Sequence, residues 1–110
     1  MSDSLVQVVR GDTQPQVALY LEEGSEPMDL SGKDVLVHIR RNPRSGVILS
    51  KTAVTTTSGA PNGEAFIVWG VGDLDIESGT YQFEIEIKDN TGYRYTVFEI
   101  FELEVRDDFA

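Results

Sequence analysis

The sequence has no cysteine and only one histidine, His38, among its 110 residues. Without thiols, disulfides and thiolate metal sites are excluded, and synthesis in a reducing compartment is expected. A single imidazole also excludes any metal site or proton relay that needs two histidines. Apolar runs stay well short of the roughly 18 residues that a membrane helix needs, and residues 1–4 lack the basic and apolar regions of a secretory signal. We therefore expect synthesis in a cytoplasm, with no membrane partner.

Positive charge is scarce as well. Nine Lys and Arg residues face 19 Asp and Glu residues, which gives a formal net charge of -10. Nucleic-acid binding needs Lys and Arg gathered on one face, so nucleic acid is not expected as a partner. The charge is unevenly spread: it is -5 over residues 1–32, +4 over residues 33–63 and -9 over residues 64–110.

What the sequence does have is alternation. Apolar residues occupy every second position from Tyr81 to Ile87, and polar residues occupy the positions between them. Side chains on a strand point to opposite faces with a period of two, so this pattern predicts a half-buried antiparallel strand over residues 80–88. The turn at residues 89–92 joins it to a second expected strand, 93–106, whose apolar phase is disturbed near Glu99. A local bulge there would explain the disturbance.

Similar but shorter patterns occur upstream. The expected strands cover residues 5–10, 16–21, 35–41, 47–54, 64–69, 80–88 and 93–106. Turn-forming residues separate them, and no repeat or linker interrupts the chain. The sequence thus predicts a single all-β domain over residues 1–110, an immunoglobulin-like β-sandwich of about seven antiparallel strands.

The most specific local motif starts at Glu77. With Gly79, Tyr81 and Phe83 it resembles the D-x-G-x-Y-x-C stretch of immunoglobulin domains, with Phe in place of the Cys. Glycine permits the sharp corner, and the tyrosine hydroxyl can bond to upstream backbone in a tyrosine corner. We interpret the motif as a folding signal.

Candidate catalytic and metal sites are weak. Asp73, Asp75 and Glu77 form D-x-D-x-E, but position six of a calcium loop would be Ser78 rather than Gly, so a solvated acidic turn is preferred. His38 falls on the polar face of its strand, and no G-x-S-x-G elbow accompanies the serines. We predict no catalytic residue, no metal and no cofactor, and hence no enzyme.

The basic stretch in the middle has two interpretations. Arg40 and His38 can face Glu84 and Glu86 as cross-strand pairs. Alternatively, Arg40, Arg41 and Arg44, with Lys51 nearby, form a positive edge that meets the acidic end of a neighbouring copy. A head-to-tail contact of that kind closes into a ring. The three arginines are therefore a possible interface.

The order of the motifs resembles a known family. The segments that carry the resemblance are Val9–Thr13, Met28–Val35, Ile67–Trp69, Asp73–Leu74, Gly79–Tyr81 and Asp89–Gly92. Over nearly the whole chain they are similar to the immunoglobulin-like N-terminal domain of phage baseplate upper proteins and related small tail or head accessory proteins. The resemblance implies a phage virion structural protein that docks onto other virion proteins, located in a virion assembled in the bacterial cytoplasm.

A second hypothesis comes from another class of function. β-Sandwiches can bind sugars by stacking them on exposed aromatic rings. The candidate rings here are Trp69, Tyr93, Tyr95 and Phe98. A carbohydrate-binding or adhesive module is therefore the alternative to the virion protein.

Overall fold

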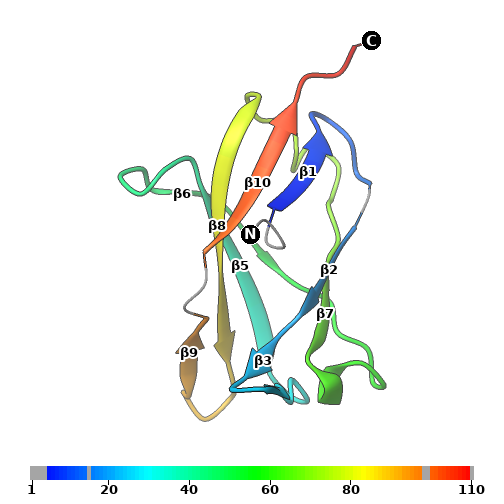
Figure 1. The fold of residues 1–110 in the computed structure, drawn as a ribbon, viewed down its shortest axis with the longest axis vertical. Coiled ribbons are helices and arrows are strands. Elements are labelled where there is room, and N and C mark those ends of the chain that lie inside the picture. Colours follow the sequence, from blue (N-terminus) through cyan, green and yellow to red (C-terminus); the bar gives the residue numbers. More distant parts are fainter. Residues whose placement is uncertain (1–4, 15, 98–99, 110) are drawn as a thin grey trace.

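The structure is a computed structural model that describes residues 5–14, 16–97 and 100–109. Its regular structure is almost entirely extended (Figure 1). The strands are β1 (Leu5–Val9), β2 (Val17–Tyr20), β3 (Glu22–Glu23), β4 (Glu26–Pro27), β5 (Asp34–Arg40), β6 (Val47–Thr52), β7 (Glu64–Ile67), β8 (Gly79–Lys88), β9 (Arg94–Thr96) and β10 (Phe101–Arg106). One 3-10 turn, η1 (Ala60–Asn62), precedes β7. No helix within the described ranges is long and apolar enough to cross a membrane.

The larger sheet has the strand order β1-β10-β8-β5-β6, and β9 also pairs with β8. The ten-residue β8 lies at its centre and buries the alternating face that the sequence predicts. β5 runs antiparallel to β8 and places Val35 opposite Ile87 and Val37 opposite Ile85. These side chains are fully buried, so the inner face of the sheet lies along the predicted apolar positions.

The second layer is smaller. β2 pairs with β7, and Val54 forms an isolated bridge to Phe66 on β7. Because Val54 lies two residues after the end of β6, the chain passes from the larger sheet to the smaller one over this short stretch. β3 and β4 form a short acidic hairpin next to this layer. One buried core joins the layers, which confirms the predicted all-β sandwich.

Two features of the larger sheet differ from the prediction. β1 pairs with β10 in parallel, from Leu5 opposite Glu102 to Val9 opposite Arg106. Parallel neighbours need a long connection, and here nearly the whole chain lies between them. The expected strand 93–106 is also divided into β9 and β10. The Glu86–Thr96 pair and the Phe83–Phe101 pair are three residues apart on β8 but five residues apart on the segment that joins β9 to β10. This segment therefore has two more residues than the part of β8 that it faces. The bulge predicted near Glu99 falls on residues 98–99, which lie outside the described residues.

The predicted tyrosine corner is confirmed. The Tyr81 hydroxyl donates to the Glu77 carbonyl oxygen at 2.5 Å, and the Arg41 guanidinium donates to the same hydroxyl at 3.0 Å. Gly79 has a φ of +140°, a backbone conformation that favours glycine. Phe83 fills the core position of the missing cysteine and stacks on Phe101, with 5.1 Å between the ring centroids. The motif thus fixes the start of β8.

Candidate functional site

A hydrogen-bonded cluster crosses the outer face of the larger sheet. His38 on β5 lies directly opposite Ser50 on β6. Its Nδ1 is 2.8 Å from the Ser50 Oγ, and its Nε2 is 3.0 Å from the Glu86 Oε1 on β8. Arg94 on β9 donates to the other Glu86 oxygen. Four strands are thereby connected, and the predicted pairing of His38 with an acid of β8 is confirmed.

Glu86 is the buried member of this cluster. Hydrogen bonding from His38, followed by bonding and charge attraction from Arg94, holds the pKa of Glu86 below its usual range, although burial opposes the shift. The carboxylate is therefore charged at neutral pH. A charged carboxylate can only accept, so His38 Nε2–H donates to Glu86 in this pair.

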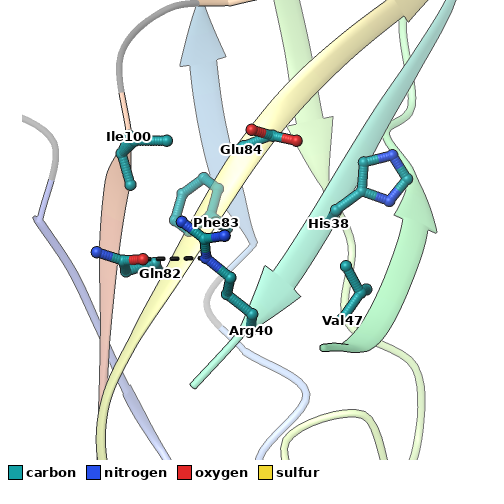
Figure 2. Close-up of a pocket in the computed structure, with 7 residues that line it drawn as sticks. All are labelled: His38, Arg40, Val47, Gln82, Phe83, Glu84 and Ile100. Carbon is teal, nitrogen blue, oxygen red and sulfur yellow. Dashed lines mark hydrogen bonds between the residues drawn. The ribbon is translucent and has the colours of Figure 1, made fainter. Parts of the chain in front are cut away.

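The order Ser50, His38 and Glu86 is that of a nucleophile, a base and an orienting acid. A substrate would need a pocket over the serine hydroxyl. A hollow with a volume of about 50 Å³ borders His38, and Figure 2 shows the side chains that line it. They are His38, Arg40, Val47, Gln82, Phe83, Glu84 and Ile100, and Ser50 is not among them. The cluster therefore ties the strands together, and this hollow does not extend over the serine hydroxyl.

The three acids of D-x-D-x-E point to three different bases. Asp73 accepts from Lys51 at 2.6 Å, Asp75 from Arg10 at 3.2 Å, and Glu77 from Arg41 at 3.1 Å. They do not converge on one point, as calcium ligands must. Among the described residues, no group of three His, Cys, Asp or Glu side chains could hold a metal ion. The predicted acidic turn is correct, but Asp73 is largely shielded from solvent.

The three arginines of the possible interface, Arg40, Arg41 and Arg44, have different surroundings. Arg40 donates to Gln82 on the outer face, at 3.1 Å. Arg41 lies at the tyrosine corner, with its guanidinium 4.9 Å from the Tyr81 ring centroid. Arg44 is exposed in the turn between β5 and β6. The ring-forming contact is not tested by this placement and stays a prediction.

The free edge of β6 is a feature that the sequence reasoning missed. Ala53 N–H donates to the Val35 carbonyl oxygen at 2.7 Å, and Ala53 continues the β6 register against β5. Backbone groups alternate in direction along an antiparallel strand. The N–H and C=O groups of Ser50 and Thr52 therefore point away from β5, where no other strand of the described chain pairs with them.

Two exposed apolar side chains lie at the start of this edge. Val47 is 57% exposed and Ile48 is 50% exposed. β-Branched residues in the run 47–54 predict a strand, but only the topology shows that this strand ends the sheet.

The aromatic residues proposed for sugar stacking are dispersed. Trp69 is 3% exposed and belongs to the core, whereas Tyr93 is 48% exposed and lies 5.8 Å from the Lys33 ammonium. Tyr95 is half-buried against the core. Phe98 lies outside the described residues. The three described rings therefore do not form a common exposed platform.

Comparisons with known proteins concern the fold. The sequence matches no family model and no curated protein. The structure is similar to CopC from Methylosinus trichosporium OB3b, with a TM-score of 0.56 and 11% sequence identity, over 98% of this chain and 89% of CopC. CopC is a β-sandwich. At this identity the likeness shows a shared fold.

This comparison corrects the functional prediction. The sequence predicts a phage virion structural protein, with a carbohydrate-binding or adhesive module as the alternative. The prediction of a virion structural protein is wrong, because a solved structure that the chain resembles is CopC, a copper-binding protein. The alternative module is not clearly favoured by this comparison. The family resemblance, the lack of enzymatic activity, the partners and the location are not tested by the comparisons and stay predictions.

Proposed function

We propose that this chain is a non-catalytic binding module that takes up an extended polypeptide strand at the free edge of β6. The observation that carries the proposal is the outward backbone of Ser50 and Thr52, flanked by the exposed side chains of Val47 and Ile48. An added strand gains main-chain hydrogen bonds from such an edge and side-chain contacts on both of its faces.

Edge strands of proteins that avoid pairing are protected by charged residues, including inward-pointing ones, by proline or by β-bulges. β6 has one charged residue, Lys51, and its ammonium is turned toward Asp73 at 2.6 Å. Lys51 is thus an inward-pointing charge, and a register irregularity lies between Ile39 and Arg40, so the edge open to an added strand is confined to the short stretch around Ser50 and Thr52. At the other end of the sheet, the apolar side chains of β1 are buried or half-buried, so that edge offers less apolar surface.

Copper binding, by analogy with CopC, does not fit the residues of this chain. Both ring nitrogens of His38 are already engaged, by Ser50 and by Glu86. Arg94 lies against Glu86 and would repel a cation there. Since the described residues hold no other group of metal ligands, we derive no copper site.

The proposal can be tested with a display library of random heptapeptides panned against the purified protein. We expect enrichment of strand-forming peptides whose amide chemical-shift changes on ¹⁵N-labelled protein fall on β5 and β6. Ile48→Lys places a charge at the edge and should weaken binding at least about tenfold, or about 1.4 kcal/mol. Val68→Lys is the matched control, because Val68 is an exposed valine that directly follows β7, a strand of the smaller sheet. Absence of enrichment, or shifts confined to another surface, would contradict the proposal.

A further inference from the structure

We infer that the outer face of the smaller sheet docks a partner protein whose contact surface has arginine among aliphatic side chains. This face belongs to β2 and β7, so the inference goes beyond the proposed function and does not depend on it. It is supported by the apolar composition of the face, by the acidic side chains at its border and by one contact that the chain makes within itself.

The outward side chains of the smaller sheet are mostly apolar. Ala18 lies opposite Phe66, and Phe66 also lies opposite Val54. Because opposite residues on paired strands point to the same face, these three side chains form one apolar row across the sheet. Tyr20 and Val68 extend the row along β2 and β7, which lie side by side in Figure 1. Phe66 is half-buried, and the other four side chains are exposed.

The outer face of the larger sheet is polar by comparison. His38 and Arg40 on β5 lie there, with Gln82, Glu84 and Glu86 on β8. The outer face of a sandwich layer is usually polar because it faces water. The apolar face of the smaller sheet departs from this rule, and contiguous exposed apolar patches mark interaction surfaces.

Acidic side chains border the apolar face at one end. Glu64 lies directly opposite Tyr20. The hairpin that follows β2 adds Glu22, Glu23 and Glu26. Within the described ranges, no Lys, Arg or His forms an ion pair with any of these four carboxylates. These charges therefore favour a basic protein surface as the partner and oppose an anionic lipid surface.

The chain itself shows how arginine contacts a tyrosine together with a glutamate. The Arg41 guanidinium lies 4.9 Å from the Tyr81 ring centroid and donates to Glu77 at 3.1 Å. Tyr20 and Glu64 offer the same two groups, because opposite residues on antiparallel strands have Cβ atoms about 4.5–5.5 Å apart. No cation of the described chain lies over the Tyr20 ring. We therefore place the partner's arginine there, with its aliphatic neighbours over the apolar row.

Peptide display with a depletion step tests this surface. A library of random dodecapeptides is first depleted on Val68→Lys, which places a charge in the apolar face, and is then panned against the wild-type chain. We expect enrichment of peptides with arginine next to valine, leucine or isoleucine, and their amide chemical-shift changes should fall on β2 and β7. Peptides that bind the β6 edge are removed by the depletion step, because Val68→Lys leaves that edge unchanged.

Affinities of an enriched peptide test the arginine contact. Tyr20→Ala and Glu64→Gln should each weaken binding about two- to fivefold, the range expected for an exposed cation–π contact or ion pair. Tyr93→Ala and Glu102→Gln are the matched controls, because they remove the same groups at exposed positions of the larger sheet. They should leave the affinity unchanged, and circular dichroism checks that all four variants are folded.

A change in the peptide tests the contact without altering the protein. Lysine in place of the peptide's arginine keeps the charge but removes the planar group that stacks and pairs, so binding should weaken about two- to fivefold. Equal affinities would show attraction to the net charge of -10 alone and would overturn the inference.

Two further outcomes would also overturn it. One is that no arginine-containing peptide survives depletion; if undepleted panning still yields peptides that bind β6, the proposed function stands. The other is binding to phosphatidylcholine vesicles that Tyr20→Ala abolishes, because the face would then contact lipid.

Discussion

The Lys51 ammonium and the Asp73 carboxylate form an ion pair at 2.6 Å that connects the edge strand β6 to the loop between β7 and β8. Both side chains are about one-fifth exposed, at 21% and 20%. The same Asp73 oxygen also accepts the Gly70 N–H at 2.6 Å. One carboxylate therefore orders its own loop and turns the charge of the edge strand inward.

Asp73→Asn should lower the free energy of unfolding by about 1.5–3 kcal/mol, the usual contribution of hydrogen bonds to charged groups. The matched control is Asp75→Asn, because Asp75 pairs with Arg10 where both side chains are well exposed. Such exposed pairs contribute about 0–1 kcal/mol. Urea unfolding of both variants measures the difference. Equal losses would show that the Asp73 contacts contribute no more than a surface pair.

Acid should destabilise the protein through Asp73 and Glu86. Hydrogen bonding from Lys51 lowers the pKa of Asp73, and hydrogen bonding from His38 and Arg94 lowers the pKa of Glu86. A carboxyl group with a lowered pKa binds its proton more weakly in the folded state than in the unfolded state. Its contribution is thus complete above the unfolded pKa of about 4 and is lost as the pH falls through the lower folded-state pKa.

Circular dichroism during urea unfolding, repeated between neutral and acid pH, measures this dependence. Glu86→Gln should flatten the decline in stability on acidification. Glu84→Gln is the control, because Glu84 lies on the same strand and has no ion pair within the described residues. A wild-type protein whose stability is constant through the acid range would contradict the prediction.

Tyr81→Phe should destabilise the fold by about 1–3 kcal/mol, because the Glu77 carbonyl and the Arg41 guanidinium each lose a hydrogen bond in a part-buried position. The hydroxyl that is removed donates to Glu77 and accepts from Arg41. Tyr20→Phe is the control, since Tyr20 is 69% exposed, and surface changes of this kind stay within about 0.5 kcal/mol. Equal unfolding temperatures for Tyr81→Phe and Tyr20→Phe would contradict a stabilising role of the tyrosine corner.

Gly63→Ala should be strongly destabilising. Gly63 has a φ of +76°, and a Cβ atom there would lie 2.2 Å from the Leu21 carbonyl oxygen. Left-handed backbone alone costs a non-glycine residue about 1–3 kcal/mol, and the clash with backbone adds to this. Gly46→Ala is the matched control, because a Cβ at that position meets nothing within 4 Å. The yield of folded protein and the free energy of unfolding should both be clearly lower for Gly63→Ala than for Gly46→Ala.

The local sequence pattern predicts where the strands of this fold lie better than it predicts which strands pair with each other. The alternation from Tyr81 to Ile87 is sufficient to predict β8 and its buried face, because side-chain direction depends on adjacent residues alone. The parallel pairing of β1 with β10 joins residues almost a whole chain apart. No local pattern reports such a pairing.

The candidate site shows the same limit. Pairing of His38 with an acid of β8 follows from strand order, and the structure confirms it with Glu86. The partner of Arg40 is Gln82 rather than an acid, because the cross-strand register places those two residues opposite each other. That β6 is the free edge depends on the arrangement of all the strands, and the composition of residues 47–54 does not contain this information.

The passage of the chain between the two layers after β6 has a mechanical consequence. Thr52 ends the strand in one sheet, and Val54 is already held by two backbone hydrogen bonds to Phe66 in the other. This end cannot peel away without opening the second layer, whereas the end at Val47 is held by the turn from β5. Fraying should therefore start at Val47, and amide exchange should slow progressively toward Thr52.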